Sequence, residues 1–164
     1  VNAIVTKGHP FFCQEKLGKD KKVFKIVKFR SMKMTANPNL APSDMNAEYQ
    51  KSLETGFGKF LRKTSIDETP QLLSIFIGKM AFIGPRPGAA YNEEELISKR
   101  EKYIPNAFDV KPSLSGLAQI KMNREHDPVL KAKFDHEYVK NISFFLDVKL
   151  FIRVVPPTSM KQFL

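Results

Sequence analysis

The sequence predicts an α+β fold that is predominantly helical, with a small β-hairpin and short strands, in a single domain over residues 1–164. A chain of this length can bury one substantial core. Hydrophobic residues make up 42% of the chain and charged residues 27%, as in folded rather than disordered proteins. Apolar and basic residues alternate near the start as in strands, whereas later segments are bounded by the capping residues, glycines and prolines typical of helices.

The first predicted element is a β-hairpin. Phe11–Phe12 and the alternating run Val23–Phe29 have strand patterns, and Leu17–Lys22 between them has the composition of a turn. Cys13 is the only cysteine, so no intrachain disulfide can form. Its place after two phenylalanines predicts a small buried side chain rather than a catalytic thiol.

Short helices are expected next. After a loop rich in Asn and Pro over residues 35–43, Ser43 could cap a helix over Asp44–Glu54 that Gly56 would stop. A second helix should run over Gly58–Lys63.

The middle of the chain predicts a helix, an extended piece and a rigid turn. Thr69 and Pro70 have the pattern of an N-cap and a first helical residue, so a helix should begin there and end near Gly78. Ala81–Ile83 should be extended and lead into the turn Gly84–Pro87.

The C-terminal half should be mainly helical. We expect an exposed helix over Tyr91–Tyr103 with Glu95 and Lys99 at ion-pair spacing, a loop and then an apolar strand over Lys111–Ile120, and helices over Lys131–Val155 that break near Asn141–Ser143 and stop at Pro156–Pro157.

The last predicted helix is amphipathic. Lys149 and Arg153 lie opposite an apolar face formed by Phe144, Phe145, Val148, Phe151, Ile152 and Val155. A helix that faces the core and a helix that lies on a membrane interface both fit this pattern. The sequence has no signal peptide and no run of about 18 apolar residues that could span a bilayer.

The chain is strongly basic. Its 27 Lys and Arg residues against 17 Asp and Glu give a formal charge of +10, which predicts an anionic partner such as nucleic acid, a phosphorylated metabolite or an anionic membrane. Eight basic residues against one acidic residue stand in the segment 16–33, where a solvated strand and turn is an equally good explanation. Most aromatic residues are Phe in apolar runs, without a nucleic-acid-binding signature, so nucleic acid is not the expected partner.

The candidate catalytic and metal-binding residues are the adjacent carboxylates Asp67 and Glu68. Two acids before a helix often only complement its dipole, and Ser65 and Glu68 have the spacing of a capping box. Three neighbouring features favour a phosphate site instead: the basic pair Arg62–Lys63, the backbone donors of a helix N-terminus, and Arg86 as a bidentate clamp. One carboxylate could then hold Mg²⁺ while the other attacks phosphorus to form an acyl-phosphate.

Other chemistry is not indicated. The three histidines lack zinc-ligand spacing, and no Gly-rich nucleotide-binding loop is present. Asp109, Asp127 and Asp135 are scattered and are expected to be solvated or to cap helices.

Several collinear segments resemble one family. The runs FFCQEKLGKDKKVFKIVKFRSMKM, GKFLRKTSIDETPQL, GKMAFIGPRP, KPSLSGLAQI and FDHEYVKNISFFLDVKL are similar, in this order, to the catalytic domain of bacterial sugar transferases, the monotopic phosphoglycosyl transferases. The resemblance extends from Phe11 to about Val155. The family usually has Pro-Gly where this chain has Pro112–Ser113.

The resemblance implies a reaction. A UDP-sugar would donate sugar-1-phosphate to polyprenyl (undecaprenyl) phosphate and release UMP, which begins the assembly of exopolysaccharide, capsule or another glycoconjugate. Asp67 would be the nucleophile of a covalent phosphosugar intermediate, and Glu68 would help to bind Mg²⁺. The candidate substrate-binding residues are Arg62, Lys59, Arg86, Pro85, Pro87, Arg30 and Gln119.

The resemblance also implies a membrane location. A hydrophobic helix that enters the bilayer and turns back would precede Val1 and would hold the protein on the cytoplasmic face. This location favours the interfacial interpretation of the last helix, and contact of the basic segment with anionic lipid or with the diphosphate. The alternative is a basic module that binds anionic lipid or nucleic acid without catalysis.

Overall fold

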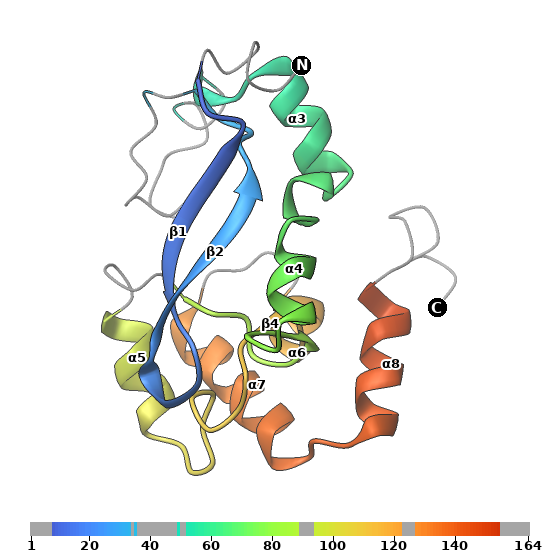
Figure 1. The fold of residues 1–164 in the computed structure, drawn as a ribbon. Helices are drawn as coiled ribbons and strands as arrows, with labels where there is room; N and C mark the ends of the chain where they lie inside the picture. Colours follow the sequence, from blue (N-terminus) through green and yellow to red (C-terminus); the bar gives the residue numbers. More distant parts are fainter. Residues whose placement is uncertain are drawn as a thin grey trace.

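The computed structural model describes residues 8–33, 35, 49, 52–88, 94–122 and 127–154. The fold is α+β, as predicted: two two-stranded sheets and a set of helices (Figure 1). The elements are β1 (Phe11–Leu17), η1 (Lys19–Lys21), β2 (Val23–Phe29), α3 (Gly56–Lys63), η3 (Ile66–Glu68), α4 (Gln71–Phe76), β3 (Ala81–Ile83), α5 (Glu94–Glu101), β4 (Ser113–Ser115), α6 (Leu117–Lys121), α7 (Pro128–Lys140) and α8 (Phe144–Val154). Residues 36–43 of the predicted loop, most of the helix predicted over 44–54, residues 91–93 of the helix predicted over 91–103 and the stop at Pro156–Pro157 lie outside the described residues.

The predicted hairpin is confirmed. β1 and β2 pair antiparallel, with Phe11 opposite Phe29, and the backbone N–H of Asp20 in the turn donates to Phe108 O at 2.8 Å. Cys13, opposite Val27, is exposed, so its predicted burial is wrong. A two-stranded ribbon has too little neighbouring structure to cover both faces along its whole length.

The helix α3 begins two residues earlier than predicted. Thr55 is its N-cap, and the Thr55 hydroxyl accepts a hydrogen bond from Gly58 N at 2.9 Å. Gly56 is therefore the first residue of α3 rather than a stop. A Cβ on Gly58 would lie 1.8 Å from Ser31 O, so glycine allows α3 to pack directly against the chain that leaves β2.

The helix α4 begins later than predicted but ends where expected. Thr69 has helical φ/ψ and its hydroxyl donates to Ile66 O at 2.8 Å, so it is not the N-cap. The reason is that η3 places a 3₁₀ turn where the sequence pattern predicts a cap. At the other end, Gly78 has a φ of +76°, and Lys79 N donates to Ser74 O at 2.9 Å, as in a Schellman motif.

The strands β3 and β4 form a short parallel pair at the centre of the core. Ala81–Ile83 is extended as predicted, and Ile83 lies opposite Ser115. The strand predicted up to Ile120 is wrong after β4, because Leu117 and Ala118 form α6 and are buried, where α6 contacts α7 and α8. The core cluster consists of Ile83, Leu117, Tyr138, Val139 and Leu150.

The helix α5 packs on α7 through a buried ion pair. Arg100 Nη2 lies 2.5 Å from Asp135 Oδ2, and the two side chains are only 3% and 2% exposed. The expectation of a solvated or capping Asp135 is therefore wrong. The helix α5 is exposed on its outer side, as expected, while Leu96 and Arg100 are buried against α7. Glu95 and Lys99 do pair, at 3.8 Å, on the outer side of α5. Asp127 caps α7, as expected, by accepting from Val129 N at 2.7 Å.

The predicted break between the last two helices is confirmed, because α7 ends at Lys140 and α8 begins at Phe144. Leu150 is the buried residue of α8, whereas Phe144 and Phe145 are 77% and 84% exposed. The interpretation that this phenylalanine-rich face points into the core is therefore wrong. Within the described ranges, no helix combines the length and the apolar character that crossing a membrane requires.

The close approach of Gly116 to Gly84 gives a stability prediction. A Cβ at Gly116 would lie 1.9 Å from Gly84 O, so Gly116→Ala must push apart β4 and the loop that follows β3. We expect a loss of about 1–3 kcal/mol in the free energy of unfolding, measured by chemical denaturation. The control Gly56→Ala, which meets nothing within 4 Å, should keep or slightly raise stability. Equal stability of Gly116→Ala and the wild type would contradict this packing.

Candidate active site

The carboxylate pair lies in η3, on the turn between α3 and α4. Ser65 has a φ of +58°, which turns the chain after α3, and Ser65 O accepts from Glu68 N at 3.2 Å. The predicted capping box does not form, because the Ser65 side chain makes no capping hydrogen bond. The turn presents Asp67 and Glu68 to β2 and to the loop after β3.

Glu68 is held by two cations from distant segments. Arg86 donates to both carboxylate oxygens, with Nη1 at 3.1 Å from Oε2 and Nη2 bound to Oε1, and Lys28 Nζ lies 2.8 Å from Oε1. Burial alone would raise the pKa of Glu68, but the charges and hydrogen bonds of Arg86 and Lys28 outweigh it and lower the pKa to about 2. Glu68 is therefore ionised throughout the physiological pH range.

Asp67 has the opposite character. Burial, and then the negative charge of Glu68, raise the pKa of Asp67 above its ordinary value of 3.8, against the lowering effect of Lys28 and Arg62. The two adjacent carboxyl groups therefore differ in basicity. Asp67 is the more basic of the two, which suits a nucleophile, whereas Glu68 is a fixed anion.

Arg86 is held in place by hydrogen bonds of both its side chain and its backbone. Its guanidinium donates to Leu114 O as well as to Glu68, and its backbone carbonyl accepts from Arg100 Nη2 at 2.9 Å. The neighbouring Pro85 is buried and its carbonyl accepts from Ser113 N at 2.9 Å, while Pro87 is half-buried. The buried Arg100 thus connects the core to the loop that carries Arg86.

Arg62 joins the site, and Lys59 lies near it in sequence. Arg62 Nη1 lies 2.5 Å from Glu54 Oε1, and its charge acts on Asp67. Lys59 is exposed in α3 three residues before Arg62, so the two share one side of the helix.

Two predicted substrate-binding residues lie elsewhere. Arg30 donates to His9 O and Phe11 O, at 3.0 and 3.2 Å, at the open end of the hairpin. Gln119 lies in α6, where its Oε1 is buried without a hydrogen-bond partner among the described residues. No hydrogen bond or ion pair within the described ranges joins Arg30 or Gln119 to the carboxylate pair.

Lys28 is a site residue that sequence reasoning missed. It is one of the eight basic residues of the segment 16–33, for which the sequence predicts a solvated strand and turn or a contact with anionic lipid or diphosphate, without singling out Lys28. The alternation of β2 contained a signal, because Lys28 shares its side of the strand with the buried Ile26, whereas Lys25 is on the other side.

The chemistry of the site fits Mg²⁺ when substrate completes the coordination. Magnesium is commonly bound through one or two carboxylates together with phosphate oxygens and water. Asp67 and Glu68 supply such carboxylates, and in the described part of the chain no group of three His, Cys, Asp or Glu side chains could form a closed metal site. A cation at Glu68 would compete with Lys28 and Arg86 for the same oxygens.

Comparison of the sequence with known proteins identifies a family and several relatives. Residues 1–160 match the family described as "Bacterial sugar transferase". The UDP-glucose:undecaprenyl-phosphate glucose-1-phosphate transferase of Escherichia coli (strain K12) is 35% identical over 148 residues, which cover 87% of this chain and 31% of that protein. The undecaprenyl-phosphate galactose phosphotransferase of Salmonella typhimurium is 30% identical, over 89% of this chain and 32% of that protein.

A third relative differs in its sugar. The UDP-N-acetylgalactosamine-undecaprenyl-phosphate N-acetylgalactosaminephosphotransferase of Aeromonas hydrophila is 31% identical, over 90% of this chain and 35% of that protein. The chain thus spans about a third of the length of the curated relatives it matches. On the match over residues 1–160, the chain belongs to the bacterial sugar transferase family.

Proposed function

We propose that this chain carries the catalytic centre of an enzyme that transfers sugar-1-phosphate from a UDP-sugar to undecaprenyl or another polyprenyl phosphate, with release of UMP. The observation that carries the proposal is the arrangement of the carboxylate pair. Arg86 and Lys28 bind Glu68 and lower its pKa to about 2, whereas burial raises the pKa of the adjacent Asp67. The names of the relatives, which refer to UDP-sugars and undecaprenyl phosphate, indicate the two substrates.

The reaction would proceed in two displacements at one phosphorus. A carboxylate oxygen of Asp67 attacks the phosphorus that bears the sugar, the bond from this phosphorus to the bridging oxygen breaks, and UMP leaves with the electron pair. A phosphate oxygen of the acceptor then attacks the phosphorus of the aspartyl phosphosugar. The carboxylate of Asp67 leaves, and the product is a polyprenyl diphosphate sugar.

The neighbouring charges would serve both displacements. A diphosphate is anionic and so is the attacking carboxylate, so positive charge must reduce their repulsion. Arg86 and Lys28 lie at Glu68, and the charge of Arg62 acts on Asp67. Bound Mg²⁺, held by Glu68 and Asp67, would neutralise the diphosphate further and polarise its P–O bonds.

A lipid acceptor also calls for a surface that meets a membrane. The exposed apolar side chains of α8 include Phe144, Phe145, Val148 and Ile152, and Phe151 makes an edge contact with Phe82 of β3 at 6.0 Å between ring centroids. We propose that this face of α8 lies at the cytoplasmic interface of the membrane, with basic residues near anionic lipid.

Release of UMP tests the proposed function. The full-length protein, incubated with Mg²⁺, polyprenyl phosphate and a panel of UDP-sugars, should release UMP with at least one donor, and release should stop when Mg²⁺ is chelated. A protein that binds anionic vesicles but releases no UMP with any donor would instead be the non-catalytic lipid-binding module.

The pH dependence of this reaction should change when Lys28 is replaced. Asp67 must be ionised to attack, so the rate should fall on the acid side as Asp67 becomes protonated. Lys28 lowers the pKa of Asp67. Lys28→Met should therefore raise this pKa and move the acid limb of the pH–rate profile to higher pH. The control Lys33→Met, where Lys33 Nζ donates to Ser52 O, should leave the limb in place, and an unmoved limb in Lys28→Met would contradict this assignment.

A further inference from the structure

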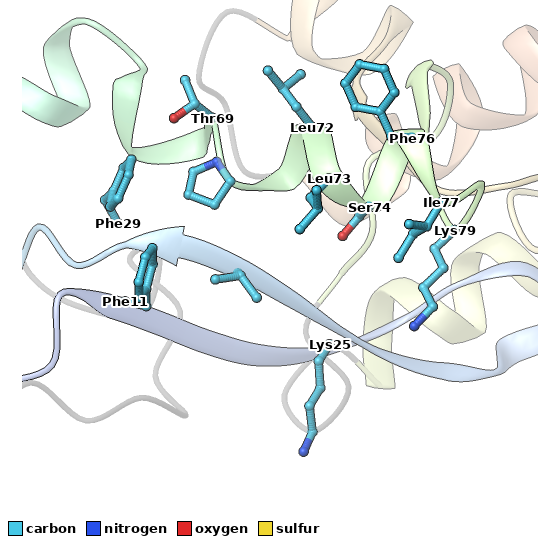
Figure 2. Close-up of a pocket in the computed structure, with 12 residues that line it drawn as sticks. Phe11, Lys25, Phe29, Thr69, Leu72, Leu73, Ser74, Phe76, Ile77 and Lys79 are labelled. Carbon is cyan, nitrogen blue, oxygen red and sulfur yellow. The ribbon is translucent and has the colours of Figure 1, made fainter.

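An apolar groove runs between the hairpin and α4. Its volume is about 660 Å³, within the usual range for sites that bind small molecules. Figure 2 shows Leu73 of α4, and Ile77 directly after α4, facing the hairpin. The groove is lined by Phe11, Lys25, Val27, Phe29, Thr69, Pro70, Leu72, Leu73, Ser74, Phe76, Ile77 and Lys79.

The lining favours a hydrocarbon ligand. Leu73 and Phe76 remain 69% and 84% exposed, although exposed apolar side chains of this size are unfavourable in water when they are clustered. A nucleotide would need several hydrogen-bond donors and acceptors along the groove. Between its two ends only Ser74 and Lys25 are polar, and the other lining side chains there are aliphatic or aromatic. A flexible hydrocarbon chain would instead cover these side chains and gain from their burial.

One end of the groove adjoins the turn that carries the carboxylate pair. Thr69 and Pro70 line it, and Thr69 directly follows Glu68. Phe11 and Phe29 lie at this same end, and Lys79 lies at the opposite end (Figure 2). The cations that would attract a phosphate, Lys28 and Arg86, bind Glu68 beyond this end. Lys28 follows Val27 and precedes Phe29, which both line the groove, but its side chain lies on the other side of β2.

Cationic side chains next to an apolar channel match one kind of ligand, an anionic head group on a hydrocarbon tail. We propose that the groove between β2 and α4 holds the first isoprenoid units of the acceptor lipid, with the lipid phosphate directed to Asp67. This inference rests on the proposed function and adds a location for the acceptor. It assigns Leu73 and Ile77 to acceptor binding.

Binding can be tested without catalysis, by tryptophan fluorescence. The sequence contains no Trp, so an introduced Trp gives the whole signal of this chain. Leu73→Trp would place a single fluorophore in the groove, and Ile104→Trp, at a residue 90% exposed outside it, provides the matched control. Farnesyl phosphate in a non-ionic detergent should cause a saturable blue shift in Leu73→Trp, at lower concentration than farnesol. Inorganic phosphate should cause none, and Ile104→Trp should not respond.

Three results would overturn the proposal. One is the absence of a shift in Leu73→Trp, and another is an equal shift in both variants, which would indicate non-specific partition. The third is a blue shift of Leu73→Trp that is already present without ligand. It would either grow with protein concentration or, in the full-length protein, stay unchanged at saturating farnesyl phosphate. A second copy of the chain or another segment of the protein would then occupy the groove.

Kinetics separate this inference from the proposed function. Leu73→Asp should lower kcat/KM for long-chain polyprenyl phosphate at least tenfold more than it lowers the formation of the covalent adduct from UDP-sugar alone. Ile104→Asp should change neither rate. Equal loss of both rates in Leu73→Asp would overturn the acceptor groove. If the wild type forms no adduct at all, the proposed function fails, and the fluorescence titration alone then decides whether the groove binds prenyl phosphate.

Discussion

Asp67→Asn should abolish the release of UMP, with a loss of about three orders of magnitude or more in rate. The amide has nearly the shape of the carboxylate but is not an anionic nucleophile, so no aspartyl phosphosugar can form. The fold should persist, because the substitution removes a charge that Glu68 disfavours. UMP release and thermal unfolding, measured on the same preparation, would separate a loss of chemistry from a loss of structure.

A second acid-to-amide change provides the control. Asp20 lies in the hairpin turn with a φ of 54°, a conformation that Asn adopts readily, and its carboxylate is exposed near Lys22. Asp20→Asn should keep wild-type activity. Near-wild-type release of UMP by Asp67→Asn would show that another residue is the nucleophile.

Arg86→Lys should reduce kcat by about 10²–10³-fold while the chain stays folded. The guanidinium contacts both oxygens of Glu68 and also Leu114 O, and a lysine ammonium cannot reproduce this fork. The matched control is Arg153→Lys, at an exposed position of α8, which should retain activity. A wild-type kcat in Arg86→Lys would mean that only the charge of Arg86 is needed.

The same variant should change the pH dependence of stability. The pKa of Glu68 is about 2 in the folded protein against an ordinary value of 4.5, so its ion pairs stabilise the fold fully above pH 4.5, and this contribution is lost as the pH falls towards 2. In Arg86→Lys the pKa of Glu68 should rise, and less stability should then be lost on acidification. Denaturation curves between pH 2 and pH 7 would measure the difference.

Elements with strong local signals could be predicted from the sequence. The alternation in Val23–Phe29 and the break near Asn141–Ser143 both specify backbone conformation through neighbouring residues, and both are confirmed. Gly78 ends α4 because its left-handed conformation suits glycine. By contrast, Leu117–Ile120 has an apolar pattern that fits a strand or a helix, and only packing against α7 and α8 decides between them.

The site was predictable in part for the same reason. Asp67 and Glu68 are adjacent in sequence, and Arg62 and Arg86 lie within 20 residues of them, so the sequence pattern itself indicates these four residues. Other residues reach the site only through tertiary contacts. Lys28 pairs with Glu68, 40 positions away in sequence, and Arg100, which supports the loop of Arg86, pairs with Asp135, 35 positions away. The alternation of β2 places Lys28 on the side of the buried Ile26, but no local pattern identifies Glu68 as its partner, or Asp135 as the partner of Arg100.

The most direct test of the central claim is the mass of the intact protein after incubation with a UDP-sugar in the absence of acceptor. We predict an increase equal to one sugar phosphate, which peptide mapping locates on Asp67, and which disappears when polyprenyl phosphate is added. An unmodified wild-type protein that nevertheless releases UMP when acceptor is present, or an adduct on another residue, would contradict the assignment of Asp67 as the nucleophile.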